Sequence, residues 1–267
     1  MLRDITIGQF YNTKSLMHKL DPRTKLIGLF VIMVLIFSLN SIYGYAVAFL
    51  FTAMCILLSR VPLGYILKGM KPVWLIVLFT FVLNIFMGGG ETVICKWWIF
   101  TIKKEALILA VSMMARVVLL VTVSTLLTLT TNPMSLTTGI EKLLKPLERV
   151  KFPSHEVAMM MSIALRFIPT LTDEAEKIMK AQASRGNDFE SGSIVKKAKG
   201  MIPLFIPLFI GAFRRADDLA MAMECRCYNG GNNRTSFKKL EFKMCDFVAF
   251  FAIFVYAIVL VILNIWG

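Results

Sequence analysis

The sequence predicts an all-α polytopic membrane protein with about five spans and a cytoplasmic domain of amphipathic helices. Hydrophobic residues make up 57% of the 267 positions, more than an ordinary soluble domain carries. They gather in long uncharged runs rather than in amphipathic stripes. A polar block separates the last run from the others. We therefore expect a membrane domain over 1–131, a polar helical domain over 132–245 and a final span over 246–267.

The first uncharged run, Leu26–Ser59, is too long for one span and barely long enough for two. Its middle reads Ser-Ile-Tyr-Gly at 41–44, a sequence suited to a turn, so the run predicts a hairpin of two short helices. Val73–Met87 is a short third run that stops before three glycines. Ala106–Thr130 is a fourth, interrupted only by Arg116, and Phe247–Trp266 is a fifth with twenty uncharged residues.

The distribution of Lys and Arg predicts the orientation of these spans. The N-terminal 25 residues, the connection around Lys68 and the polar block are all rich in basic residues, so we expect them on the cytoplasmic side of a cell membrane. The net charge of +13 follows from the same bias, which suits an acidic lipid leaflet. No basic stripe with interleaved aromatic residues is present, so nucleic acid is not an expected partner.

Inside the polar block, the pattern is helical and prolines mark the breaks. Pro133 opens one segment, Met134–Leu144, and His155–Leu171 is a second, apolar enough to lie against a membrane or a partner. Two further stretches, Asp173–Gly186 and Asp217–Tyr228, begin with adjacent carboxylates and end with an arginine before a helix stop. Acidic residues favour the first turn of a helix and Arg followed by Gly favours its end, so we expect helices to begin at both acidic pairs.

Motifs for catalysis, cofactors and metals are missing from the sequence. No phosphate-binding glycine loop, no Gly-x-Ser-x-Gly and no His-Glu-x-x-His sequence occurs. Cys225 and Cys227 form a Cys-x-Cys pair without the further ligands that a tetrahedral site needs. The sequence therefore predicts a protein that is not an enzyme, with no catalytic residue, bound cofactor or metal.

Four segments together carry a family resemblance. They are ITIGQFYNTKSLMHKLDPRTKL near the start, SRVPLGYILKGMKPV, ALRFIPTLTDEAEKIMKAQASRG, and AMAMECRCYNGG near the end of the polar block. In this order they resemble the transmembrane T component of energy-coupling factor (ECF) transporters, from one end of the chain to the other. The resemblance implies a scaffold that joins two cytoplasmic ABC-type ATPases to a substrate-binding membrane protein, the S component, for uptake of vitamins or similar micronutrients.

The resemblance also implies which residues bind the partners. In the family, two short X-Arg-X motifs, often Ala-Arg-Gly, end the coupling helices and insert into the ATPases. The first matches here as Ser184-Arg185-Gly186, and the second keeps only its central arginine, as Cys225-Arg226-Cys227. A run of three methionines, Met159, Met160 and Met161, offers a flexible apolar surface for S components of different shapes.

Two other functions stay open at this stage. An integral membrane enzyme acting on lipid or isoprenoid substrates would use the polar block as its active domain, and a conventional ABC permease would line its own substrate path. Copurified ATPases and a small membrane protein would distinguish a T component from both.

Arg116 lies inside the fourth uncharged run, where a charged side chain raises the free energy of membrane insertion. We therefore expect it to be buried among helices, with Ser112, Thr122 and Ser124 nearby.

Overall fold

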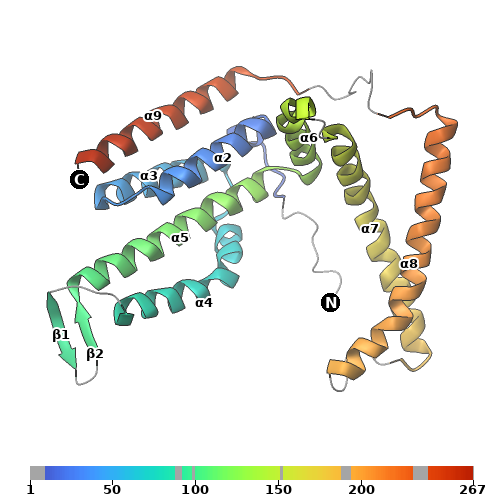
Figure 1. Ribbon diagram of the computed structural model, residues 1–267, viewed down its shortest axis with the longest axis horizontal. Coiled ribbons are helices and arrows are strands. Elements are labelled where there is room, and N and C mark those ends of the chain that lie inside the picture. Colours follow the sequence, from blue (N-terminus) through green and yellow to red (C-terminus); the bar gives the residue numbers. More distant parts are fainter. Residues whose placement is uncertain are drawn as a thin grey trace. The chain divides into compact units, whose positions relative to one another are not determined.

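A computed structural model describes residues 10–87, 92–97, 100–150, 153–187, 194–230 and 240–266 (Figure 1). Contacts divide these residues into two compact units. The first, here called the membrane-helix unit, comprises 10–139 and 240–266; the second, the α7–α8 unit, comprises the described residues between 140 and 230.

The membrane-helix unit is built around one central helix. This helix, α5, contacts three of its neighbours, and α9 packs against two of them, α2 and α3 (Figure 1). The helices of the unit are α1 (Leu16–Lys19), α2 (Pro22–Phe37), α3 (Ile42–Ser59), α4 (Leu63–Met87), α5 (Lys104–Thr130) and α9 (Met244–Trp266). The predicted fold class, a helical membrane protein, is therefore confirmed.

Four helices are long and apolar enough to cross a membrane among the described residues: Ile42–Ser59, Leu63–Phe86, Lys104–Thr130 and Met244–Ile265. They correspond to four of the five predicted spans. The remaining one is α2, whose 16 residues extend roughly 24 Å. The predicted hairpin of two short helices is confirmed, although its turn lies at 38–41, just before the predicted position, and Ser41 is the N-cap residue of α3.

Two features of this unit depart from the sequence pattern. Helix α4 begins ten residues before the apolar run at Val73, because Pro72 lies inside the helix and does not end it. In Figure 1, α4 changes direction along its length, as expected for a helix that loses one backbone hydrogen bond at a proline. The second feature is an antiparallel hairpin of β1 (Val93–Trp97) and β2 (Phe100–Lys103), with Trp97 opposite Phe100, in a loop for which no strand was predicted.

The core of the membrane-helix unit lies near the turn between α2 and α3. Ile36 and Leu39 are fully buried there, against Ala48 of α3 and Leu119 of α5. The rings of Phe51 and Tyr256 stack with their centroids 4.1 Å apart and join α3 to α9. Burial of such large side chains on all four helices aligns them around α5.

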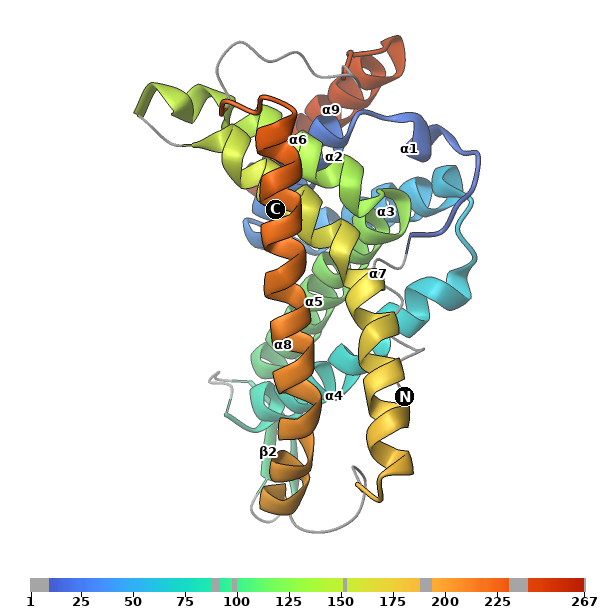
Figure 2. The same ribbon diagram turned by 90° about the vertical axis from the view of Figure 1, so that its right-hand side faces the viewer.

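The second unit consists mainly of two long helices. After α6 (Pro133–Leu144), which leaves the first unit, a 3-10 helix over Lys145–Val150 leads to α7 (Ser154–Ser184) and α8 (Ile194–Cys225). Helices α7 and α8 run in opposite directions, contact each other and separate toward the start of α7 and the end of α8 (Figures 1 and 2).

Helices were expected to begin at Asp173 and Asp217, and this expectation is wrong. Both acidic pairs lie well inside continuous helices, which also contain Pro169, Pro203 and Pro207. Acidic residues favour a first turn only where backbone N–H groups lack partners, and here the preceding helical turn already supplies their acceptors. The apolar segments before each acidic pair therefore belong to the same helices as the arginines.

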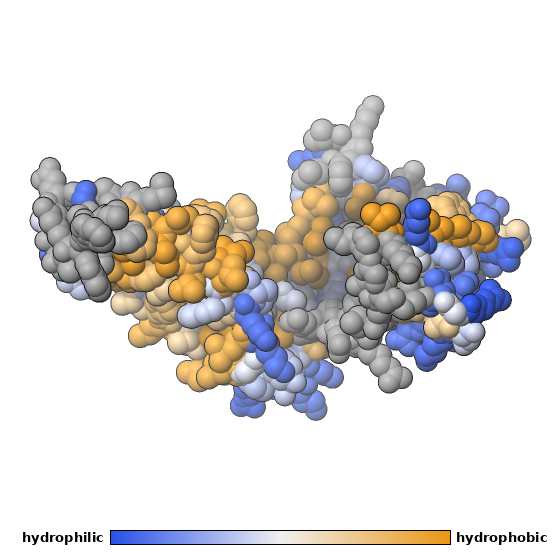
Figure 3. Space-filling model, turned by 90° about the horizontal axis from the view of Figure 1, so that it is seen from below, coloured by the Kyte–Doolittle hydropathy of each residue, from blue (hydrophilic) through white to orange (hydrophobic). Residues whose placement is uncertain are grey.

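Hydropathy differs between the units. Figure 3 shows hydrophobic residues gathered over the helices of the membrane-helix unit, whereas hydrophilic residues predominate over the α7–α8 unit, which also carries a hydrophobic strip. The exposed apolar residues of α8 lie three or four positions apart and so share one helix face. Those between positions 202 and 213 are Ile202, Phe205, Ile206, Phe209, Ile210 and Phe213.

Candidate functional site: two arginine-bearing helix ends

The first candidate motif forms the C-terminal cap of α7. Ser184 is the last helical residue, Arg185 is the cap, and Gly186 adopts a left-handed conformation with φ of 83°. The Gly186 N–H donates to the Ala183 carbonyl at 3.0 Å, and the Asn187 N–H donates to the Gln182 carbonyl at 3.1 Å. This pair of bonds defines a Schellman cap, which satisfies carbonyls at the helix end and turns the chain sharply after the arginine.

The second candidate motif builds the same cap at the end of α8. Cys227 donates from its backbone N–H to the Glu224 carbonyl at 2.8 Å, and Tyr228 donates to the Met223 carbonyl at 3.0 Å. Cys227 occupies the position that corresponds to Gly186, with φ of 57°. A side chain in this conformation is strained, so the loss of glycine from the second motif costs stability but leaves the geometry of the cap intact.

Both caps present an arginine to the surroundings. All six motif residues, Ser184, Arg185, Gly186, Cys225, Arg226 and Cys227, are exposed in the chain. A cation at a helix C-terminus is favourably placed with respect to the helix dipole, and a guanidinium can form paired hydrogen bonds with a carboxylate. The structure therefore displays two unshielded arginines on rigid helix ends, suited to an acidic groove.

The two arginines lie at opposite ends of the helix pair, because α7 and α8 are antiparallel (Figure 2). The Asn187 side-chain amide donates to the Gly200 carbonyl at 3.1 Å and ties the end of α7 to the first turns of α8. Arg226 closes the other end of α8, whose 32 residues extend roughly 48 Å. Each arginine can thus contact a different partner surface.

An ion pair links the two helices between the motifs. Glu174 of α7 and Arg215 of α8 form a salt bridge, and both side chains are half-buried. A Cβ atom at Gly211 would lie 3.0 Å from Glu174 Oε1, so glycine permits the close approach of the helices at this point. Sequence reasoning missed this pair because it assigned Glu174 to a helix start; its only signal was an acidic and a basic residue on apolar helix faces.

The predicted methionine surface lies near the start of α7. Met160 and Met161 are exposed and Met159 is half-buried. Together with the apolar strip of α8, they give the α7–α8 unit unpartnered hydrophobic residues on both helices.

A buried polar cluster joins the N-terminal segment to α9. Asp21 caps α2, accepting a hydrogen bond from the Arg23 N–H at 2.9 Å. The Asp21 N–H in turn donates to Asp246 Oδ1 at 2.8 Å, and the Lys243 N–H donates to Asp246 Oδ2 at 2.8 Å. Asp246 is only 1% exposed, and the sequence analysis did not single it out. An acidic residue at the start of an otherwise uncharged run is the signal that could have identified it.

The first described residues are attached to the end of α5. The Tyr11 N–H donates to the Leu129 carbonyl at 2.9 Å, and the Tyr11 carbonyl lies 2.8 Å from His18 Nε2. Because a carbonyl only accepts, Nε2 carries the proton of the neutral imidazole, and Nδ1 accepts from the Ser15 hydroxyl at 2.7 Å. Desolvation by burial lowers the pKa of His18 below its ordinary value.

Arg116 of α5 points between helices, as expected from the free-energy cost of exposing an arginine to lipid. Its Nη2 donates to the Leu39 carbonyl at 2.6 Å and to the Tyr45 hydroxyl at 3.1 Å. Leu39 lies just beyond the end of α2, where backbone carbonyls lack helical partners. Among the described residues, Arg116 forms no hydrogen bond with the Ser112, Thr122 or Ser124 side chains; the hydroxyls of Thr122 and Ser124 donate to carbonyls of their own helix.

Comparison with known proteins gives one consistent family. A family model described as "Cobalt transport protein" (CbiQ) matches residues 13–237. The protein "Energy-coupling factor transporter transmembrane protein EcfT" of Clostridium kluyveri is 51% identical over 267 residues, covering 100% of this chain and 99% of the relative. The protein of the same name in Ruminiclostridium cellulolyticum is 53% identical over 246 residues, covering 92% of each chain. The Bacillus subtilis protein of that name is 47% identical over 240 residues, covering 90% of this chain and 91% of the relative. With these matches over nearly its whole length, the chain belongs to the family of transmembrane components of energy-coupling factor transporters.

Proposed function

We propose that the chain couples two cytoplasmic ABC-type ATPases to a substrate-binding S component and is not itself an enzyme. The observation that supports this role most strongly is the pair of matching helix caps, each presenting an exposed arginine, at opposite ends of α7 and α8. Arg185 enters a groove of one ATPase and Arg226 a groove of the other. Closure of the ATPase dimer on ATP then moves the two helices and reorients the S component that rests on them.

The proposed orientation places the N-terminal segment and the α7–α8 unit in the bacterial cytoplasm. It is supported by the basic residues of these segments, which the positive-inside rule assigns to that side. ATP is available there, so the arginines meet the ATPases on the correct side of the membrane. Labelling of single-cysteine variants in right-side-out vesicles tests the orientation: Asn229→Cys should react only after the membrane is permeabilised.

The test of the coupling role is removal of each arginine and of both. Removing one partner of a buried charge pair costs about 2–5 kcal/mol, because the carboxylate left behind is desolvated and unpaired. Arg185→Ala and Arg226→Ala should each reduce substrate uptake and ATPase copurification, and the double variant should abolish both. Lys at either site should rescue only in part, because an ammonium cannot form the planar paired contact.

Arg166 and Arg214 provide matched controls. Both are exposed arginines on α7 and α8 but lie away from the helix ends. Their replacement by alanine should leave ATPase copurification unchanged. Full uptake and full ATPase recovery in the Arg185→Ala, Arg226→Ala protein would contradict the proposal.

The S component is proposed to rest on the apolar surface of the α7–α8 unit, which includes the half-buried Met159 and the exposed Met160 and Met161. Methionine is flexible and polarizable, so this surface can fit partners of different shape. Replacing all three by leucine keeps the surface apolar and should change the uptake of different substrates unequally. Met113→Leu, in the membrane-helix unit, is the control. An equal change for every substrate, or no change, would argue against an adaptable surface.

A further inference from the structure

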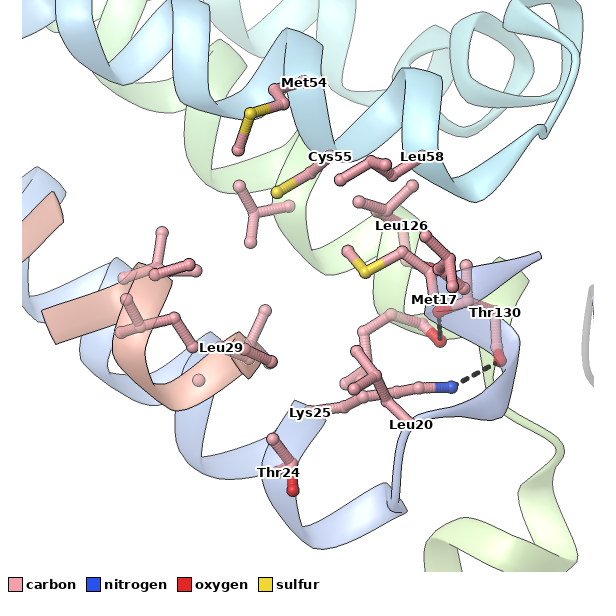
Figure 4. Close-up of a pocket in the computed structure, with 18 of the residues that line it drawn as sticks. Met17, Leu20, Thr24, Lys25, Leu29, Met54, Cys55, Leu58, Leu126 and Thr130 are labelled. Atoms are coloured by element: carbon pink, nitrogen blue, oxygen red, sulfur yellow. Dashed lines mark hydrogen bonds between the residues drawn. The ribbon is translucent and has the colours of Figure 1, made fainter. Parts of the chain in front are cut away.

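The membrane-helix unit contains a cavity of about 370 Å³ between α2, α3, α5 and α9 (Figure 4). It lies away from the hairpin turn, where Ile36, Leu39 and Tyr45 close the packing between α2 and α3. Toward Pro22 and Ser59 the two helices separate, and Cys55 of α3 and Leu29 of α2 face each other across the space in Figure 4. Protein interiors contain few voids larger than a water molecule, so a space of this size, open at its rim, can receive an occupant.

The cavity walls select an apolar occupant. Two of its threonine hydroxyl groups are used within their own helices: Thr52 donates to the Ala48 carbonyl and Thr130 to the Leu126 carbonyl, both at 2.8 Å. The third, that of Thr24, is buried and has no hydrogen-bond partner among the described residues. Among the lining residues that the structure describes, Lys25 alone carries a charge. Ordered water needs two to four polar partners at its site, which most of this wall does not offer.

The rim of the cavity opens through membrane helices. On the α9 side, Met244 is 83% exposed and Val248 is 67% exposed, and on the α3 side Met54 and Leu58 are also exposed. Both helices are long and apolar enough to span a membrane. The opening therefore faces lipid hydrocarbon, and acyl chains are the apolar molecules available to enter it.

Lys25 gives one end of the cavity a cation with a hydrogen still to donate. Its Nζ donates to the Thr130 carbonyl at 2.8 Å and, at 3.4 Å, to the Thr131 hydroxyl. An ammonium has three donors, and the third has no partner among the described residues. The carboxylates of Asp246 and Asp21 interact electrostatically with Lys25, but both accept hydrogen bonds from backbone N–H groups, Asp246 from Asp21 and Lys243, and Asp21 from Arg23. Further basic residues, Arg23, Arg60 and Lys243, lie on the same ends of these helices.

We propose that this cavity binds the acyl chain of an anionic phospholipid whose headgroup accepts a hydrogen bond from Lys25 Nζ. The chain lies against Leu29, Cys55 and Leu126, and the phosphate lies near the helix ends that carry the basic residues. An acidic headgroup is attracted to such juxtamembrane cations. This inference rests on the membrane-helix unit and is independent of the ATPase coupling role.

Photocrosslinking of the full-length chain, with any subunits that copurify, tests the proposal in nanodiscs. The probe is phosphatidylglycerol with a diazirine in the acyl chain, and the crosslinked peptides are mapped by mass spectrometry. Crosslinks should concentrate on the cavity-lining parts of α2, α3 and α9. Cys55→Phe fills the cavity and should reduce them at least fivefold, whereas Leu57→Phe adds a ring on the outer face of the same helix and should not.

Competition distinguishes the source of the acyl chain without any substitution. Unlabelled phosphatidylglycerol should compete at least fivefold better than phosphatidylcholine, and better than free oleate. Lys25→Met should remove this preference, whereas Lys19→Met, at an exposed lysine outside the cavity, should keep it. The proposal is overturned by crosslinks that Cys55→Phe leaves unchanged, by equal competition from phosphatidylcholine, or by stronger competition from oleate.

Discussion

Glu174 of α7 and Arg215 of α8 form an ion pair, and each lies eleven residues before the arginine that ends its own helix. The segments from this contact to Arg185 and to Arg226 are thus equal in length, roughly 16 Å each. They lead away from the contact in opposite directions, because the helices are antiparallel. We therefore expect a movement at one arginine to reach the other helix through this ion pair.

Reversal of the ion pair tests this relationship. Glu174→Gln and Arg215→Gln should each lower stability by about 1 kcal/mol, a modest value because both side chains are partly exposed. Each should also reduce uptake more than it reduces ATPase copurification, since the arginines remain in place. The exchanged variant, Glu174→Arg with Arg215→Glu, should restore much of the loss. Thermal unfolding and substrate uptake are measured for the two single variants and for the exchanged variant. If the exchanged variant shows the sum of the two single losses, Glu174 and Arg215 do not interact directly.

The two caps predict opposite effects of substitution at matching positions. Cys227→Gly should stabilise the end of α8 by about 0.5–1 kcal/mol, because glycine adopts the observed left-handed conformation without strain. Gly186→Ala should destabilise the end of α7 by about 1 kcal/mol, although open space surrounds the position. Amide hydrogen exchange at the helix ends measures both. Cys227→Ala, which removes sulfur but keeps the strain, should bring no gain.

Asp246 should be the most sensitive acidic residue of the membrane-helix unit. Asp246→Ala removes the acceptor of two buried N–H groups, those of Asp21 and Lys243, and should cost roughly 2–4 kcal/mol. Asp246→Asn keeps one acceptor oxygen and should cost less. Thermal inactivation of the purified complex is the measurement, with the exposed Glu241→Ala as the control. A loss no larger than that of the control would exclude the proposed link between α2 and α9.

Arg116 should stabilise the turn between α2 and α3. Arg116→Leu leaves the Leu39 carbonyl with only the Tyr45 hydroxyl as a donor and should lower stability by about 1–3 kcal/mol despite the gain in hydrophobicity. Arg116→Lys should recover part of this loss. A lipid-soluble thiol probe should label Arg116→Cys slowly in a variant without the native cysteines. Rapid labelling with unchanged assembly would instead place this side chain in lipid.

Acidification should weaken the attachment of the N-terminal segment. The folded pKa of His18 lies below 6.5, so the unfolded chain binds more protons between that folded value and pH 6.5. The folded state therefore has the full stabilising contribution of neutral His18 above about pH 6.5. This contribution declines as the pH falls from 6.5 through the folded pKa. His18→Gln should remove that part of the pH dependence. Hydrogen exchange at Tyr11 and neighbouring amides between pH 5 and 7.5 provides the measurement.

Local patterns were sufficient for four of the five predicted spans, the helix break between α2 and α3, and the two arginine-bearing helix ends. These features depend on residues that are adjacent in sequence: uncharged runs, turn residues, and an arginine followed by Gly186. The same local reasoning failed at Asp173 and Asp217, because a helix start and a helix interior differ in what precedes them and not in the acidic pair itself.

The contacts that hold these elements together join residues far apart in sequence. Asp21 meets Asp246 across 225 positions, and Arg116 reaches the Leu39 carbonyl across 77. The pair of Glu174 and Arg215, the cavity around Lys25 and the positive φ of Cys227 likewise depend on how helices pack or end. Residue types and their periodicity determine which segments become helices and which faces are apolar, because those preferences are local. The partner of each buried polar group is decided only when the helices pack, since packing brings distant donors and acceptors within hydrogen-bond distance.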